Sequence, residues 1–204
     1  ASRGKPVPAE SKGAGPAGIQ LGDVRLVNGA VSFADARSGA KHRLEKINVR
    51  LSLPDIDGPF AAKGEATWNA QRVELDIGAA KARALMTGQA TAINAAVTSE
   101  PITLSFKGTA MAADPAKVDG EVDLKVPSVR RLAAWLGQPI EAPGSGLGPL
   151  SIAGKLSVAG PRVTFSDARM GLDATRANGE IMIDGGRARP YLKGRLDVAA
   201  LDVN

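Results

Sequence analysis

The chain has 204 residues, of which 44% are hydrophobic and only 3% aromatic, and its formal net charge at pH 7 is +5. This length suffices for one large β domain or two small ones with a substantial aliphatic core. The absence of cysteine excludes disulfides, thiolate metal sites and cysteine nucleophiles. Basic and acidic residues are spread along the chain without a long Lys/Arg run, so we expect no nucleic-acid partner.

The first 18 residues are rich in Pro, Gly, Ala and Lys and lack hydrophobic periodicity, which predicts a flexible linker over 1–18. Residues 19–204 are predicted to form one β domain, with possible sub-segments 19–137 and 146–204 joined by a Gly/Pro-rich hinge. No run approaches the ~20 consecutive apolar residues of a membrane-spanning helix. The chain ends inside an apolar pattern, so we expect the domain to continue beyond this segment.

The first strands after the linker flank Asn28-Gly29, a dipeptide typical of tight hairpins. Segments 19–26 and 30–34 lie on either side of it and predict the first hairpin. Residues 44–53 then alternate between apolar and polar side chains, as a half-buried strand does.

A second hairpin is predicted from strands 60–68 and 72–77, joined around residues 69–71. An Asp/Gly/Pro-rich turn at 54–59 precedes it. Gly58-Pro59 recurs as Gly148-Pro149 before a similar strand pattern, which indicates a weak internal duplication. Further strands are expected near residues 85–93, 102–112, 117–126, 150–158, 162–170, 172–183 and 190–198.

Only residues 128–136 change to helical spacing. Val129, Leu132 and Trp135 fall on one helix face, Ser128 is a suitable N-cap, and a glycine follows the segment. We interpret the apolar stripe as packing that caps the end of the sheet, in preference to a membrane contact.

Glycines recur on the apolar side of the predicted strands. A glycine inside a strand marks strong twist, a bulge or the close approach of another group. Two interpretations stay open: the sheet coils tightly over its own core, or its face is hollowed as a ligand groove. The seven positions are Gly64, Gly88, Gly108, Gly120, Gly154, Gly179 and Gly194.

The strand and glycine patterns together predict an all-β fold. We expect an elongated, strongly twisted antiparallel sheet with an apolar concave face and one short α-helix. An aliphatic face of this kind holds acyl chains without directional contacts.

Motifs that carry chemistry are weak. His42 has no triad or zinc pattern around it and is interpreted as a surface histidine. Residues 55–58 (DIDG) resemble the start of a calcium loop but lack its remaining ligands, and an Asp/Gly turn explains them. The glycine-rich segment 144–148 lacks the Lys-Ser/Thr of a phosphate loop. We therefore expect no enzyme, no metal and no cofactor.

Four segments resemble the C-terminal region of AsmA-family proteins of Gram-negative bacteria. The resemblance covers nearly everything after the linker, on structural and degenerate motifs. The segments are 19–38 (IQLGDVRLVNGAVSFADARS), 128–137 (SVRRLAAWLG), 146–167 (GLGPLSIAGKLSVAGPRVTFSD) and 194–203 (GRLDVAALDV).

This resemblance implies a periplasmic β-rich body that supports outer-membrane assembly and integrity, anchored to the inner membrane by an N-terminal helix that we expect to lie outside this segment. Members of the wider group are similar to bridge-like lipid carriers, whose sheet holds acyl chains in an apolar groove. The implied partners are phospholipid or lipopolysaccharide acyl chains and, as a further possibility, other envelope proteins.

The residues expected to line such a groove come from three predicted strands. Bulky substitution of Gly120 or Gly154 is expected to reduce lipid occupancy more than stability. Two alternatives remain: a non-enzymatic scaffold or spacer that binds envelope proteins, and an enzyme with an acidic pocket that the sequence hides. The expected groove residues are Leu104, Phe106, Gly108, Gly120, Val122, Leu124, Ile152, Gly154 and Leu156.

Overall fold

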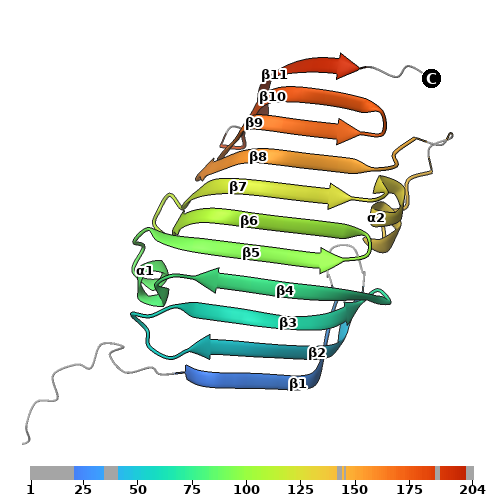
Figure 1. Cartoon of the computed structure of the whole chain (residues 1–204). Coiled ribbons are helices and arrows are strands. Elements are labelled where there is room, and N and C mark those ends of the chain that lie inside the picture. The colour runs from blue at the N-terminus through green and yellow to red at the C-terminus, as the bar shows by residue number, and fades with distance from the viewer. Residues whose placement is uncertain (1–20, 35–40, 142–143, 145, 187–188, 201–204) are drawn as a thin grey trace, which may run out of the picture.

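The structure is a computed structural model that describes residues 21–34, 41–141, 144, 146–186 and 189–200. The predicted linker, the last four residues and the side chain of His42 lie outside what the structure describes. All described strands form one antiparallel sheet in which each strand pairs with its neighbour in sequence (Figure 1). The all-β prediction is confirmed.

The sheet contains eleven strands, and two short helices lie at opposite strand ends (Figure 1). The strands are β1 (Leu21–Ala34), β2 (Lys41–Leu53), β3 (Phe60–Trp68), β4 (Gln71–Ala79), β5 (Thr91–Ser99), β6 (Ile102–Met111), β7 (Lys117–Val126), β8 (Leu150–Ala159), β9 (Arg162–Leu172), β10 (Thr175–Asp184) and β11 (Tyr191–Ala200). The helices are α1 (Ala82–Met86) and α2 (Val129–Trp135).

The pairing register separates the sheet into an apolar face and a polar face. Residues opposite each other on paired strands share a face, so one row can be followed across the sheet. A row on the apolar face runs through Val24, Leu51, Ala62, Ile77, Ala95, Phe106, Val122 and Gly154. A row on the polar face runs through Arg50, Lys63, Asp76, Ala96, Ser105, Asp123, Ala153, Arg169, Asn178 and Asp197.

The hairpin predicted at Asn28-Gly29 is wrong, because β1 runs through this dipeptide as one strand. Leu26 and Gly29, which lie on the apolar face, are three positions apart instead of two. A bulge at Asn28 (φ 51°) accommodates the extra residue. Its backbone N–H donates to Asn48 Oδ1 at 2.9 Å. Lys46 and Asp167, both with φ 50°, sit at similar irregularities in β2 and β9. Each bulge keeps the apolar side chains of both halves of its strand on the same face of the sheet.

The strand predicted at 85–93 is wrong in its first half, because α1 occupies residues up to Met86 and β5 begins at Thr91. Gly88 lies in the turn after α1 with φ 70°, so it does not belong to the sheet. Ala82 and Ala84 are buried, and alanine is the strongest helix former. The apparent alternation around Gly88 is therefore a helix followed by a turn.

The second hairpin and the predicted helix are confirmed. Asn69 and Ala70 form a two-residue turn with φ of 45° and 64°, as a type I′ hairpin requires. In α2 the backbone N–H of Arg131 donates to Ser128 Oγ at 3.3 Å, which makes Ser128 the N-cap.

Helix α2 caps one end of the strands, as its apolar stripe predicted. The rings of Trp135 and Trp68 meet edge to face with centroids 4.6 Å apart, and Trp135 Nε1 donates to the backbone oxygen of Trp68 at 3.0 Å. Asn69 Nδ2 donates back to the backbone oxygen of Trp135 at 2.6 Å. Arg131 pairs with Glu100 in the β5–β6 turn at 3.3 Å. The helix thus reaches from β7 across β5 and β6 to the β3–β4 turn.

The two Gly-Pro pairs of the predicted duplication both hold a helix N-terminus. The backbone N–H of Ala82 donates to the oxygen of Gly58 at 3.1 Å, and that of Val129 donates to the oxygen of Gly148 at 2.9 Å. The first N–H groups of a helix have no partner inside it, so these carbonyls satisfy them.

The predicted hinge does not separate two sheets, because β7 and β8 pair along their whole length of ten residues. Asp173 accepts the backbone N–H groups of Leu147 and Gly148 at 3.0 and 2.9 Å, which ties the loop to the β9–β10 turn. The guanidinium of Arg130 donates at 2.8 to 3.3 Å to the carbonyl oxygens of Ile140, Gly144 and Gly146.

We expect Trp135→Ala to destabilise the protein by about 3 kcal/mol, because it removes a partly buried ring and its contact with Trp68. Urea denaturation measures this loss. The chain has only two tryptophans, so intrinsic fluorescence also reports the docking of α2 directly. Trp135→Phe is the matched control, since it keeps a ring and loses only the indole N–H. Equal stability of the alanine variant and the unmodified protein would contradict this role of α2.

Candidate functional site

The nine residues predicted to line a groove form one contiguous patch. Leu104 on β6 pairs with Leu124 on β7, which pairs with Ile152 on β8. The next row is Phe106, Val122 and Gly154, and the third is Gly108, Gly120 and Leu156. The structure therefore brings all nine together as three rows across three strands of the apolar face.

Each of the nine groove residues is half-buried, so none is sealed in a core or fully exposed. Among the described residues all strands belong to the same sheet and the two helices lie at strand ends, so no other element covers the middle of this face (Figure 1). The buried hydrophobic residues are few and mostly alanines, with Val126 the largest that is fully buried. In the part of the chain that the structure describes, the apolar face is therefore a single uncovered layer.

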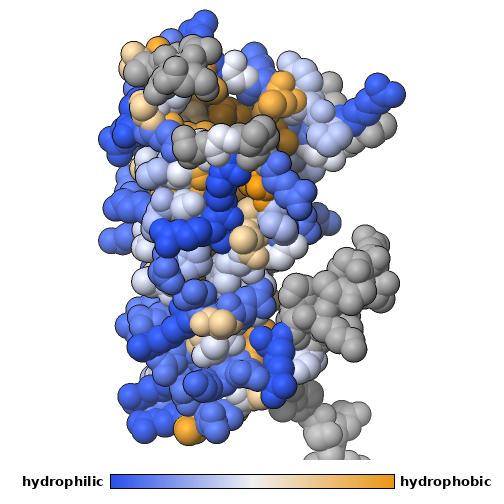
Figure 2. Space-filling model, turned by 90° about the vertical axis from the view of Figure 1, so that its right-hand side faces the viewer, coloured by the Kyte–Doolittle hydropathy of each residue, from blue (hydrophilic) through white to orange (hydrophobic). Residues whose placement is uncertain are grey.

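The exposure of this face is greatest at its two edges. Figure 2 looks at the strands from the α2 end and shows orange patches between mostly blue surfaces, with the larger ones toward the upper end. On β11 at that end, Leu192 is 68% exposed and Val198 48%, and on β1 Leu26 is 48% exposed. Among the described strands, the side chains of this face are therefore most exposed on β1 and β11.

The two strand ends of this face are closed near its middle. Thr91 and Ser99, at the two ends of β5, are the buried polar residues of the described structure. The backbone N–H of Lys81 donates to Thr91 Oγ1 at 3.0 Å, and Ser99 Oγ donates to the oxygen of Arg72 at 2.8 Å. Helices α1 and α2 lie at these ends (Figure 1). An occupant of the face would thus run across the strands, from edge to edge.

The glycines on this face allow neighbouring strands to approach closely. A Cβ added to Gly120 would lie 2.5 Å from the oxygen of Lys107 and 2.7 Å from Gly108 Cα, and one added to Gly154 would lie 2.9 Å from the oxygen of Ser166. Real Cβ atoms do not come so near to backbone, so these positions need glycine. This favours the tight-coiling interpretation of the glycine pattern.

Aromatic rings occupy the space that two of these glycines leave. Phe106 Cζ would be 2.7 Å from a Cβ at Gly120, and Phe165 Cζ would be 3.0 Å from one at Gly154. Each ring therefore lies over the glycine of the next strand. The expected effect of bulky substitutions at Gly120 and Gly154 changes accordingly, since an added side chain meets backbone and ring and reduces stability first.

Helix α1 is tied to the β2–β3 loop by an ion pair. Arg83 Nε donates to Asp57 Oδ1 at 2.5 Å, and this hydrogen bond lowers the pKa of Asp57 and raises that of Arg83. The loop itself is an Asp turn, in which the backbone N–H of Asp57 donates to Asp55 Oδ1 at 2.7 Å. The turn interpretation of DIDG is confirmed, and Asp57 is engaged by a cation from the protein itself.

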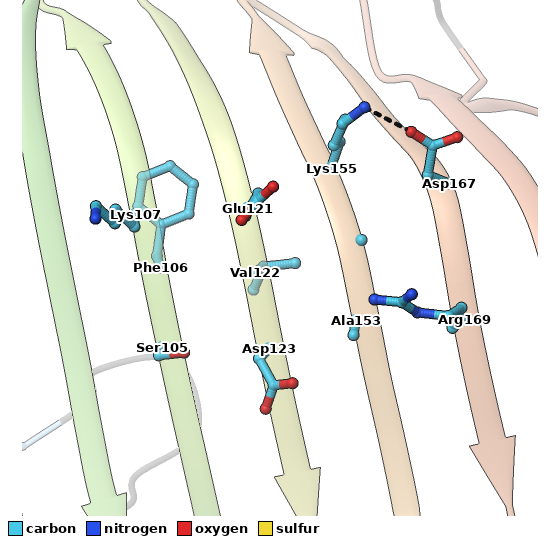
Figure 3. A pocket seen from close by; sticks show the side chains of 11 residues that line it. Ser105, Phe106, Lys107, Glu121, Val122, Asp123, Ala153, Lys155, Asp167 and Arg169 are labelled. Carbon is cyan, nitrogen blue, oxygen red and sulfur yellow. Dashed lines mark ion pairs between the residues drawn. The ribbon is translucent and has the colours of Figure 1, made fainter.

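The polar face carries a hollow of about 570 Å³ across β6 to β9 (Figure 3). Its charges alternate in sign: Lys107, Glu121, Lys155 and Asp167 all line it. Lys155 Nζ lies 2.8 Å from Asp167 Oδ2, and the hydrogen bond between them lowers the pKa of Asp167 and raises that of Lys155. The positive and negative charges of these side chains balance one another, as is usual on a solvent-exposed surface.

No group of three or more potential metal-ligating side chains occurs within the described ranges. Helix α1, the buried hydroxyls at the ends of β5 and the three bulges were not predicted from the sequence. The bulges had a signal in the sequence: an apolar spacing that slips from two to three beside Asn28, Lys46 and Asp167.

Comparisons with protein-family models, curated proteins and solved structures found no match to this chain. None of the described helices is both long enough and apolar enough to span a bilayer. The sequence resemblance and the geometry of the apolar face are therefore the observations that bear on function.

We expect Gly120→Ala to destabilise the protein by about 2 kcal/mol, because its Cβ meets the backbone of β6. Gly22→Ala in β1 is the matched control, since a Cβ there has nothing within 4 Å. Thermal unfolding of both variants measures the difference. A Gly120 variant as stable as the Gly22 variant would show that the strands do not depend on this close approach.

We expect α1 to loosen as the pH falls below about 4, near the ordinary pKa of an aspartate. The pKa of Asp57 is lowered in the folded state, so its ion pair stabilises fully above the unfolded pKa and is lost as the pH falls through the folded one. Hydrogen exchange of the Thr87 and Gln89 amides, corrected for intrinsic rates, measures this effect. Asp57→Asn should remove the pH dependence, and its persistence would assign the effect to other groups.

Proposed function

We propose that this chain is a periplasmic segment of an AsmA-like envelope protein that holds or conducts lipid acyl chains along the apolar face of its sheet. The lipid would be phospholipid or lipopolysaccharide, and the role would be to support outer-membrane assembly and integrity. In the whole protein an inner-membrane anchor would position the segment. The envelope location rests on the sequence resemblance alone.

The observation that carries the proposal is a half-exposed aliphatic face that continues from β1 to β11. Contiguous exposed apolar surface of this kind marks an interaction site. Burial of acyl methylenes against it is worth roughly 0.8 kcal/mol each and needs no directional contact. Such a face favours sliding of chains over tight capture of one headgroup.

The dimensions suit several acyl chains in series. With ~4.8 Å between neighbouring strands, the sheet extends roughly 50 Å from β1 to β11. One acyl chain spans about half of a hydrocarbon core of ~30 Å. Because the strand ends near the middle carry α1 and α2, the path with least obstruction runs along this long dimension.

A non-enzymatic scaffold or spacer is the second candidate. The exposed edge strands favour it, since unpaired strand edges are templates for another chain. A scaffold needs no lipid on the apolar face, so lipid occupancy separates the two candidates.

The first test is native mass spectrometry of the segment purified from a bacterial envelope without harsh detergent, followed by lipid extraction. Reproducible bound phospholipid or lipopolysaccharide is expected. A lipid-free mass that persists after incubation with phosphatidylethanolamine/phosphatidylglycerol vesicles would overturn lipid holding and favour the scaffold.

We expect the double variant Leu124→Gln, Ile152→Gln to lower lipid occupancy on the order of tenfold, because it places two amides in the middle of the apolar face. Ser151→Gln is the matched control: Ser151 neighbours Ile152 on β8 but lies on the polar face. Circular dichroism checks that each variant is folded. Equal occupancy in folded double variant and control would count against the apolar face as the lipid site.

A further inference from the structure

A second hollow lies on the polar face, next to the one in Figure 3, and its lining carries an excess of positive charge. Its volume is about 360 Å³, and β7, β8, β9 and β10 all contribute to it. Its one acidic lining residue, Asp123, already pairs with Lys125 at 3.5 Å. The polar side chains that line the hollow are Asp123, Ser151, Arg169, Arg176 and Asn178.

The pairing register places most of this lining in two adjacent rows across β8, β9 and β10. Each row contains one arginine, one short polar side chain and one small residue that leaves space above the backbone. The two arginines are diagonal neighbours on β9 and β10, so both long side chains can reach one ligand. The first row is Ser151, Gly171 and Arg176, and the second is Ala153, Arg169 and Asn178.

The side chain of Arg176 is held in place by neutral groups. Its Nη1 donates to the backbone oxygens of Asp173 at 2.7 Å and of Thr175 at 3.0 Å. The same nitrogen lies 3.3 Å from the position that a Cβ on Gly171 would take, and Ser151 Oγ lies 2.9 Å from that position. The guanidinium and the hydroxyl therefore both lie above Gly171. No carboxylate pairs with Arg176 among the described residues, so its charge is fixed in position but not compensated.

The guanidinium of Arg169 is available to a ligand. It reaches from β9 to β8 beside Ala153 (Figure 3). Within the described ranges this side chain makes no hydrogen bond or ion pair. The hydrogen bond with Lys155 is the main cause of the lowered pKa of Asp167, and the charge of Arg169 contributes least to it. All five N–H donors of this guanidinium can therefore serve a ligand.

We propose that this hollow binds a phosphate group, with Arg169 and Arg176 as its two charged contacts. Guanidinium groups donate parallel, charge-assisted hydrogen bonds to phosphate oxygens. Asn178 and Ser151 each add a neutral donor beside one of the arginines. Donors from three strands suit the three terminal oxygens of a phosphate ester better than the two oxygens of a carboxylate.

The site lies on the opposite face of the sheet from the proposed acyl-binding surface. A lipid held on the apolar face therefore cannot place its own phosphate in this hollow. The phosphate would come from a soluble ester or from a membrane surface that lies against the polar face. The inference does not depend on lipid holding, so its failure leaves the proposed function standing.

The first test is a titration of the ¹⁵N-labelled chain with inorganic phosphate at constant ionic strength, followed by two-dimensional NMR. We expect saturable shifts of the signals of Ser151, Arg169, Arg176 and Asn178, which the same concentration of chloride does not produce. Shifts that do not saturate, or that spread over the whole polar face, would show general screening of charge and overturn the proposal.

Arg169→Gln and Arg176→Gln should each weaken phosphate binding roughly tenfold, because each removes a charge-assisted contact. The matched control is Arg162→Gln: Arg162 also lies on β9, but it is already paired with Asp184 at 3.4 Å. Thermal unfolding checks that each variant is folded, and Arg169→Gln breaks no described hydrogen bond. Equal weakening in the control would assign the effect to net charge and contradict the site.

Flotation with vesicles of phosphatidylcholine and phosphatidic acid then identifies the source of the phosphate. Vesicle binding that Arg169→Gln reduces and inorganic phosphate competes away would assign the site to a membrane surface. Vesicle binding that neither change affects would assign the site to a soluble phosphate ester, since the apolar face alone would then account for the vesicle contact.

Discussion

Continuous antiparallel pairing is the constraint on which the rest of this structure depends. Side chains alternate between faces, so a single unpaired extra residue would turn the remainder of a strand over. The bulges at Asn28, Lys46 and Asp167 absorb such residues and keep the apolar rows aligned. Gly108 and Gly120 let the backbones of adjacent strands approach where a Cβ would collide. One aliphatic face therefore survives across eleven strands.

The positions of the two helices distinguish the strand ends of the apolar face from its edges. A sheet with one apolar side is open along all four borders, but α1 and α2 lie at opposite strand ends, and buried hydroxyls complete the hydrogen bonding there. Within the described part of the chain, the borders that carry no helix are the edges at β1 and β11. An apolar occupant would lie along the face between these two edges.

The polar face contributes charge compensation more than specific chemistry. Its ion pairs, such as Lys155–Asp167 and Lys63–Asp76, are solvent-exposed, and pairs of this kind add little to stability. The sheet is held by its backbone ladder and by partial burial of aliphatic side chains. Where charge has a defined local task, as for Arg130 with its loop carbonyls or Asp57 with α1, it fixes the segments that lie at the strand ends.

The sequence by itself determined most of the periodic features: the majority of the strands, the capped helix at Ser128, the hairpin around Asn69, and the shared face of Leu104, Leu124 and Ile152. These follow from local spacing, because alternation and capping act over a few residues. Only the tertiary structure decided what depends on neighbouring strands. It made Asn28-Gly29 a bulge through the pairing with β2 and the Asn48 hydrogen bond, and it filled the space above Gly120 with the Phe106 ring. Such outcomes depend on which backbone lies alongside, and no local pattern carries that information.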